Sequence, residues 1–185
     1  MPYGSEEGQQ ERRLCMYQVG EWIYYGNVGA CQVVGIQKMK VPGMDREHLY
    51  YTLQPFEDSC SISTPADGGK IFMRPLISKE EAEKLIAAIP DIHVQAYYNP
   101  VLRQLSEHYE NLLNTHDCRN LIRMTMSIYH KQQEAQESKK KLGAVDERFM
   151  KKAEDLLYGE LAVALGIEKK KVPAYIASAL QAQEA

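Results

Sequence analysis

The residues that most often carry metal or redox chemistry are spread widely along this chain. Its four cysteines are Cys15, Cys31, Cys60 and Cys118. None belongs to a C-x-x-C pair, the close spacing that zinc sites and thiol–disulfide centres use. His116, Asp117 and Cys118 are adjacent and bring together three groups able to bind a metal, but Asp117 is better placed as the N-cap of a helix. We therefore predict no metal site and no cofactor.

Sequence motifs of catalysis are also missing. The chain contains no G-x-x-x-x-G-K-[ST] phosphate loop, no G-x-G-x-x-G turn, no G-x-S-x-G elbow and no H-E-x-x-H helix. No nucleophile and base occur in a pattern typical of an active site. The sequence therefore predicts a protein that is not an enzyme and has no small-molecule substrate.

The composition is that of a globular protein. Of the 185 residues, 44% are hydrophobic and 25% are charged, close to the average for soluble domains. No apolar run approaches the ~20 residues that span a bilayer. The opening MPYGSEEGQQERRL lacks the apolar core of a secretory signal. We therefore expect a cytoplasmic protein with reduced cysteines and no membrane contact.

The charge balance limits how this chain can meet nucleic acid. It has 22 Lys+Arg against 25 Asp+Glu, a formal net charge of −3. Proteins that hold nucleic acid mainly through a large basic surface carry an excess of positive charge. The balance argues against autonomous, high-affinity DNA binding. It permits a weak DNA contact by a protein that a partner carries to the DNA, because tethering raises the effective concentration.

Short strands are predicted between residues 16 and 75, after a polar, flexible tail at residues 1–15. Alternating apolar and polar residues, rich in aromatic and β-branched types, predict the strands. They are expected at 17–25, 30–40, 48–56, 59–64 and 70–73. Turns are expected at Gly26-Asn27, Pro42-Gly43 and Asp67-Gly68-Gly69, and a bulge at Gly35. Five short strands with tight turns indicate a small curled sheet or barrel. The aromatic residues Trp22, Tyr24, Tyr50 and Tyr51 are interpreted as core and cross-strand packing in preference to a ligand cage.

Helices are predicted in the rest of the chain, from a boundary within residues 74–78. Ser78 and Glu81 form a capping box, and Pro90 ends the helix that follows. Further caps are expected at Asn99, Asp117 and Asp146, and Gly166 suits a helix C-terminus. Five helices, each with one apolar stripe, indicate a compact bundle. The predicted domains are thus residues 16–75 and 76–185, in an α+β protein.

Three short motifs in this order resemble the CarD family of bacterial transcription regulators. The first is Val19-Gly20-Glu21-Trp22-Ile23-Tyr24-Tyr25 with Gly29. The second is Arg74-Pro75-Leu76-Ile77-Ser78-Lys79-Glu80-Glu81-Ala82. The third is Leu156-Leu157-Tyr158-Gly159-Glu160-Leu161-Ala162.

The resemblance implies an N-terminal Tudor/SH3-like barrel, shared with the transcription-repair coupling factor, that docks on the β subunit of RNA polymerase. It also implies a C-terminal five-helix bundle that touches promoter DNA at the upstream edge of the melted region. In the family, a tryptophan near the start of the second helix wedges into the minor groove, which slows collapse of the open complex.

The sequence departs from the family at the DNA-contacting residues. Leu102 is the residue nearest the position of the wedge tryptophan, and only Arg103 keeps the positive charge usual just after it. Leu102 fits a wedge role and a core role equally, because it lies on one stripe with Leu105. Tyr97 and Tyr98 are a second pair of candidates for stacking on DNA, against packing in the interhelix loop.

Basic residues supply candidates for contact with phosphates. The clusters are Lys139 to Lys141, Arg148 with Lys151 and Lys152, and Lys169 to Lys171. For the contact with polymerase, exposed residues on an open strand edge are the candidates, because such an edge adds to a partner sheet through main-chain hydrogen bonds. These are Lys38 and Lys40 on the second strand and Ser61 and Ser63 on the fourth.

Two functions of different class follow. The first is an RNA polymerase-binding regulator that modulates promoter open-complex stability through a β-subunit contact and a weak, tethered DNA contact, with DNA-binding residues Tyr98, Leu102, Arg103, Arg148, Lys151 and Lys152. The alternative is a protein-interaction adaptor that uses the same β module without binding DNA.

Overall fold

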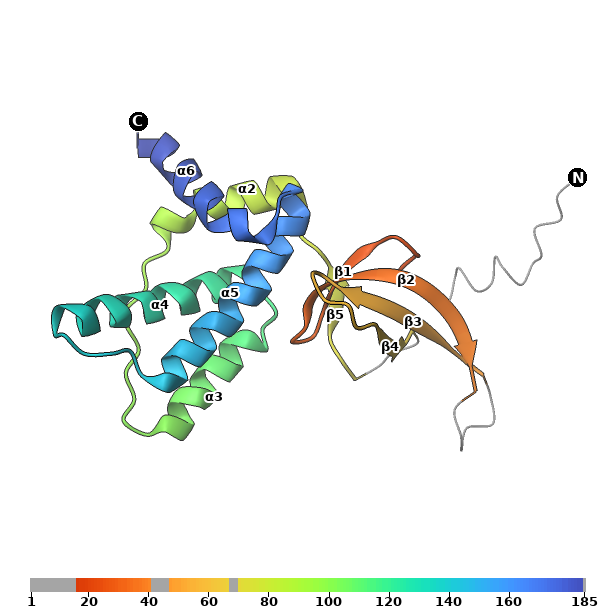
Figure 1. Ribbon diagram of the computed structural model, residues 1–185, viewed down its shortest axis with the longest axis horizontal. Helices are drawn as coiled ribbons and strands as arrows, with labels where there is room; N and C mark the ends of the chain where they lie inside the picture. Colours follow the sequence, from red (N-terminus) through yellow and green to blue (C-terminus); the bar gives the residue numbers. More distant parts are fainter. Residues whose placement is uncertain (1–15, 41–46, 67–69, 185) are drawn as a thin grey trace, which may run out of the picture. The chain divides into compact units, whose positions relative to one another are not determined.

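The computed structural model describes residues 16–40, 47–66 and 70–184. The chain forms two compact units, Met1–Leu76 and Ile77–Ala185. The first unit holds an antiparallel five-stranded sheet and the second holds five α-helices, so the α+β class is confirmed (Figure 1). The tail expected at residues 1–15 and the turns expected at Pro42-Gly43 and Asp67–Gly69 lie outside the described residues.

The sheet has the strand order β4-β3-β2-β1-β5. Its strands are β1 (Trp22–Tyr25), β2 (Gly29–Met39), β3 (His48–Pro55), β4 (Ile62–Pro65) and β5 (Met73–Pro75). The second and third strands match their predicted ranges within a residue. The first was predicted too long, because Gly20 adopts φ +97° and the chain before it leaves the extended conformation. The fifth was predicted too early in the chain, since pairing with β1 begins only at Met73.

Glycines fix two details of the sheet. Gly26 and Gly29 adopt φ values of +43° and +92°, which confirms the tight turn predicted between β1 and β2. A side chain at Gly26 would also meet Ile71, whose Cγ2 would lie 2.6 Å from an added Cβ. The predicted bulge at Gly35 is confirmed as a shift of the β2–β3 register between Val33 and Gly35.

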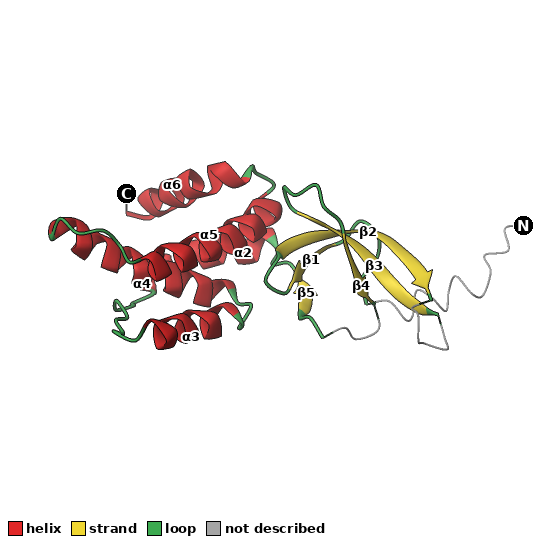
Figure 2. Cartoon of the chain, turned by 60° about the horizontal axis from the view of Figure 1, so that its bottom comes forward, coloured by secondary structure: helices red, strands yellow, loops and turns green. Residues whose placement is uncertain are grey.

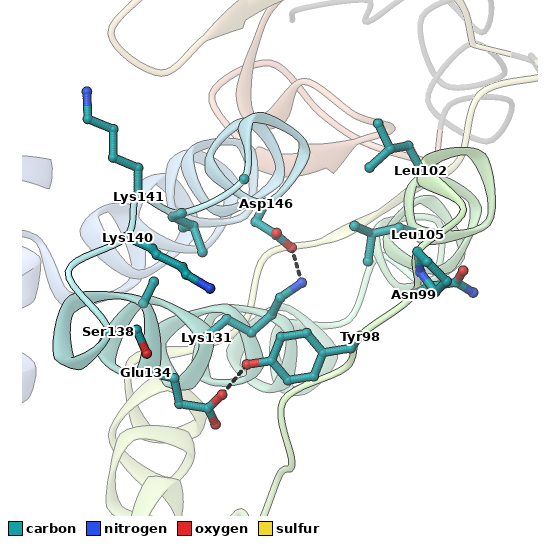
Figure 3. A pocket seen from close by; sticks show the side chains of 14 residues that line it. Tyr98, Asn99, Leu102, Leu105, Lys131, Glu134, Ser138, Lys140, Lys141 and Asp146 are labelled. Atoms are coloured by element: carbon teal, nitrogen blue, oxygen red, sulfur yellow. Dashed lines mark hydrogen bonds and ion pairs between the residues drawn. The ribbon is translucent and has the colours of Figure 1, made fainter.

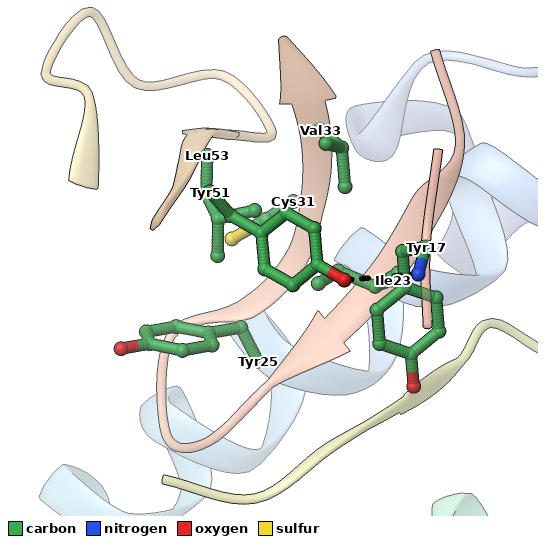
Figure 4. Packing of buried hydrophobic residues seen from close by; sticks show 7 residues of the cluster. All are labelled: Tyr17, Ile23, Tyr25, Cys31, Val33, Tyr51 and Leu53. Atoms are coloured by element: carbon green, nitrogen blue, oxygen red, sulfur yellow. Dashed lines mark hydrogen bonds between the residues drawn. The ribbon is translucent and has the colours of Figure 1, made fainter. Parts of the chain in front are cut away.

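A compact apolar core fills the first unit. Figure 4 shows its buried members, which are Tyr17, Ile23, Tyr25, Cys31, Val33, Tyr51 and Leu53. The backbone N–H of Tyr17 donates to Tyr51 Oη at 3.0 Å, so the segment before β1 is tied to β3. The packing role predicted for the aromatic residues is confirmed for Tyr24 and Tyr51, which are fully buried. Trp22 is half-buried and makes an edge contact with Phe56.

The second unit is a helical bundle, coloured red in Figure 2. Its helices are α2 (Lys79–Ala87), α3 (Leu102–Leu113), α4 (Cys118–Glu137), α5 (Ala144–Leu165) and α6 (Val172–Glu184), with 3-10 turns at Ile89–Asp91 and Lys169–Lys171. Helix α5 contacts each of the other four helices and therefore forms the centre of the unit. Its apolar stripe includes Phe149, Ala153, Leu157 and Leu161, all buried.

Three of the predicted helix caps are confirmed. Ser78 and Glu81 form the capping box at the start of α2. The Asp117 carboxylate accepts from the backbone N–H groups of Arg119 and Asn120 at the start of α4. Gly166 adopts the left-handed conformation at the end of α5. These local signals position helix ends because they satisfy backbone groups that the helix leaves unpaired.

Two predicted caps are wrong. Helix α3 begins at Leu102 with Val101 as its N-cap, and Asn99 instead accepts from the backbone N–H of Val101 at 2.9 Å, one turn ahead of the helix. Helix α5 begins after Gly143, and Asp146 lies buried in its first turn. Asp146 points to Lys131 instead of capping, because an ion pair inside the bundle satisfies its charge.

Glu160 joins two of the motifs that carry the family resemblance. Its side chain is fully buried on α5. Oε1 accepts from the backbone N–H of Ile77 at 3.1 Å, and Oε2 accepts from the Cys118 thiol at 3.0 Å. A buried carboxylate is stable only when such donors satisfy it. Glu160 therefore ties the first residue of the unit and the start of α4 to α5, and Cys118 has a structural role.

Candidate functional site

The β4 strand forms one edge of the sheet and carries two of the predicted polymerase-binding residues. In the strand order, β4 pairs with β3 alone. Ser63 lies within β4 and Ser61 directly before it, and both are exposed. The Ser63 hydroxyl donates to the Met39 sulfur at 3.8 Å. Ser63 therefore lies on an edge strand, as predicted, whereas Ser61 lies just before it.

Lys38 and Lys40 were predicted to lie on an edge strand, but neither does. Lys38 is in β2, opposite Leu49 of β3, and Lys40 follows the end of β2. Strand β2 lies inside the sheet, because β1 pairs with it over Gly29–Gln32. The strand β1 has only four residues, so among the described strands the later part of β2 pairs with β3 alone. Both lysines are exposed on this later part.

The segment that enters α3 presents apolar side chains to solvent. Tyr98 is 58% exposed and Leu102 is 63% exposed, and Val101 between them is also exposed. The core interpretation of Leu102 is therefore wrong. The buried stripe of α3 consists of Leu105, Tyr109 and Leu113, spaced at i, i+4 and i+8. Leu102 is the first residue of α3 and lies before the buried part of the helix.

Tyr97 and Tyr98 have different environments. The Tyr97 ring stacks on His108 with centroids 3.8 Å apart, and its backbone N–H donates to Ser127, so Tyr97 packs in the loop. The Tyr98 phenol donates to the Glu134 carboxylate. This hydrogen bond, as the main cause, raises the pKa of Tyr98 to about 12. The hydrogen bond fixes the position of the ring while leaving much of it exposed.

A cavity of about 640 Å³ opens beside Tyr98 and Leu102. Figure 3 shows that residues from three parts of the helical unit surround it: the entry into α3, the second half of α4, and the loop that leads into α5. Tyr98, Leu102 and Leu105 line one side. Lys140 and Lys141 come from the loop after α4. Tyr98 and Leu102 were separate candidates from the sequence; both line this cavity, which was not predicted.

A buried ion pair forms part of the cavity wall. Lys131 Nζ lies 2.5 Å from Asp146 Oδ1, and both side chains are over 90% buried. The Tyr109 hydroxyl also donates to Asp146, at 2.6 Å. Lys131 was not among the candidate residues predicted from the sequence. A sequence signal for the burial of Lys131 was present, because its position continues the helical stripe of Leu121, Met124 and Ile128.

The other predicted DNA-binding residues lie outside this cavity. Arg103 Nε pairs with Glu107 at 2.9 Å on the exposed face of α3. The Arg148 guanidinium lies over the Phe149 ring at 4.8 Å, and Lys151 and Lys152 are exposed on α5. The lysine cluster at 169–171 has acidic partners, since Lys169 pairs with Asp155 and the next two lysines pair with Glu168. None of these cations lines the cavity, and those at 103 and 169–171 are paired with acidic side chains.

Residues 17–77 match the family model of the CarD-like/TRCF RID domain. The matched segment contains all five strands described above. Residues 17–77 are a CarD-like RNA polymerase-interacting domain, or RID. The resemblance of the opening motif to this family is thereby confirmed.

The match to the RID indicates the role of the sheet. It is a Tudor-like, non-catalytic interaction domain, so this chain is an RNA polymerase-interacting protein. Within the RID, the edge of β4 and the two lysines at the end of β2 are the features that the sequence suggested for docking.

Within the described residues, no three His, Cys, Asp or Glu side chains come together in a way that could hold a metal ion. Among the described helices none is long and apolar enough to cross a membrane.

Proposed function

We propose that this protein binds the β subunit of RNA polymerase through its RID and modulates the stability of the promoter open complex through a weak DNA contact of its helical unit. The RID at residues 17–77 is the observation that carries this proposal. The regulator makes and breaks no covalent bond in this scheme. It acts by binding one state of the promoter complex more tightly than another.

The docking surface is the open edge of β4 together with Lys38 and Lys40 at the end of β2. A strand edge recruits a partner strand through main-chain hydrogen bonds, which tolerate changes of side chain. Ser61 and Ser63 keep this edge polar and small. Lys38 on β2 and Lys40 just after it lie on the other side of β3 from this edge and add positive charge, which favours an acidic partner surface.

The DNA contact is the exposed pair Tyr98 and Leu102. A leucine inserted between base steps of the minor groove unstacks them and so holds a distorted step. Both side chains are more than half exposed, so insertion would remove apolar surface from water. The chain has a net charge of −3, so we expect this contact to be weak and to need the polymerase as a tether.

Promoter open-complex lifetime, measured with and without the protein, tests the proposal. We expect the wild-type protein to change the lifetime and the Tyr98→Ala and Leu102→Ala variants to lose most of that change. Tyr129→Ala is the matched control, because Tyr129 is an equally exposed tyrosine on α4 outside the cavity. Capture of a purified β-subunit fragment by the protein is measured alongside.

The outcomes separate the two functions predicted from the sequence. Capture of the β fragment without any effect on open-complex lifetime would exclude the regulator and support the adaptor, which binds polymerase and not DNA. Arg103 favours this alternative, because its charge is already paired with Glu107. Failure to capture the β fragment at moderate salt would contradict both.

A further inference from the structure

We propose that the cavity beside Tyr98 binds one unpaired nucleotide of a DNA strand. This inference rests on the DNA contact of the proposed function and assigns that contact a ligand. In place of a wedge that only enters the groove, the helical unit would hold a base that has left the stack. The cavity, one aromatic ring and one lysine carry the argument.

The size of the cavity suits such a ligand. Its volume of about 640 Å³ falls within the ~300–1,000 Å³ that is usual for pockets of small ligands. Apolar groups supply much of the wall, among them Leu102, Leu105 and Leu142. A base moved out of the duplex needs a largely apolar surface to offset the loss of stacking.

The ring of Tyr98 supplies a stacking surface. Its phenol is held by Glu134, and the Lys131 ammonium lies 5.0 Å from the ring centroid. The side chain is nevertheless 58% exposed. A fixed aromatic ring binds a base at little cost in conformational entropy, and such stacking does not depend on the identity of the base.

Lys140 supplies the charge for a phosphate. In Figure 3 its side chain extends over the cavity toward Lys131, whereas Lys141 extends away from it. Neither lysine forms an ion pair with the described residues. The two carboxylates of the wall are already engaged, Asp146 by Lys131 and Glu134 by Tyr98. The lining holds three lysines (Lys131, Lys140 and Lys141) against two carboxylates (Glu134 and Asp146), so its formal charge is 3 − 2 = +1, beside an apolar surface.

This combination favours a nucleotide over a peptide. A peptide segment would use the apolar wall but gain little from Lys140 unless it were acidic. A nucleotide uses both, because its base stacks and its phosphate pairs with an ammonium. A nucleotide within a strand is favoured over a free one, because one ring and one lysine offer few contacts and a strand tethered at the promoter makes weak contacts sufficient.

Titration of the full chain by NMR tests the inference without polymerase. The probes are a tetranucleotide of single-stranded DNA, a blunt duplex containing the same sequence, and a deoxynucleoside 5′-monophosphate. We expect the tetranucleotide to shift the resonances of Tyr98, Leu102 and Lys140 and to bind roughly tenfold more tightly than the other two. Equal binding of the duplex, or of the monophosphate, would overturn the assignment to an unpaired DNA nucleotide.

Matched variants locate the ligand. Tyr98→Ala should weaken tetranucleotide binding by roughly tenfold or more. Lys140→Gln should weaken it and lower the slope of log affinity against log salt by about 0.7, the share of one phosphate contact to a single strand. Lys141→Gln should leave both quantities near their wild-type values. Equal effects of the two lysine substitutions would show a diffuse charge effect and contradict the proposed site.

The same variants distinguish this inference from the proposed function. If open-complex lifetime depends on Tyr98 while the tetranucleotide is bound no better than the duplex, the proposed regulatory function is supported and the nucleotide site is contradicted. If the β fragment is not captured while the tetranucleotide binds as expected, the nucleotide site is supported and the proposed regulatory function is contradicted. A loss of β-fragment capture in Leu102→Ala but not in Lys140→Gln would show that a protein segment occupies the cavity, which would overturn the inference.

Discussion

Lys131 and Asp146 form a buried ion pair at the meeting point of α4 and α5, with Nζ and Oδ1 2.5 Å apart. The two residues are 15 positions apart in the chain and come from the end of one helix and the start of the next. The Tyr109 hydroxyl donates to the same carboxylate from α3. This pair therefore holds three helices together where the cavity opens.

Removing one member of the pair should be strongly destabilising. We expect Lys131→Met to lower the free energy of unfolding by about 3–5 kcal/mol, because it leaves a buried carboxylate without its counter-charge. The double variant Lys131→Met with Asp146→Leu should recover much of that loss. Urea unfolding of the three proteins measures the effect. A double variant as unstable as the single one would show that packing, and not the unpaired charge, is responsible.

Acid should weaken the fold through His108. Burial, and secondarily the charge of Lys131, lowers the pKa of His108 below its ordinary value of 6.5. Between pH 6.5 and that lower pKa the unfolded chain binds the proton and the folded chain does not. The stability present above pH 6.5 is therefore lost progressively as the pH falls through this range.

The His108→Gln variant isolates that effect. It removes the titrating group, so the fall in urea midpoint between pH 7.5 and pH 5.5 should be smaller than in the wild type. His93→Gln is the control, since His93 is an exposed histidine of the same unit. An equal fall in the wild type and His108→Gln would place the titration at another group.

The cysteines should differ sharply in reactivity. Burial raises the pKa of the Cys31 thiol to about 12, and Cys118 is buried against Glu160. Cys60 is exposed. Since the thiolate is the reactive form, we expect Cys60 to be alkylated at pH 8 at least tenfold faster than either buried thiol. Mass spectrometry of iodoacetamide-treated protein measures each site, and rapid modification of Cys31 would show that the sheet core opens readily.

Negative charge on the proposed docking surface should weaken polymerase binding. We expect Lys38→Glu and Ser63→Glu to lower affinity for a β-subunit fragment by roughly tenfold, because a like charge at an acidic partner surface is repelled. Lys70→Glu makes the same charge change as Lys38→Glu at an exposed residue of the same unit outside the two strands. Surface plasmon resonance compares the three. Equal losses would indicate a general charge effect and place docking elsewhere.

Several local features of this protein were predictable from its sequence alone. Alternation over 48–56 predicted β3, the capping box at Ser78 predicted the start of α2, and Asp117 and Gly166 predicted two further helix ends. Each of these depends on interactions between residues at most a few positions apart. The opening motif from Val19 to Tyr25 likewise pointed to the RID, which the family model confirms over residues 17–77.

The burial of charged groups and the exposure of apolar ones depend on tertiary packing and were not predictable in this way. Lys131, Asp146 and Glu160 have side chains of surface type, and each is buried because a partner distant in the chain satisfies it. Leu102 fits an apolar stripe but lies beyond the part of α3 that is covered. Burial is a property of what packs against a residue, so neither the ion pair nor the cavity beside Tyr98 was predictable from periodicity within one helix.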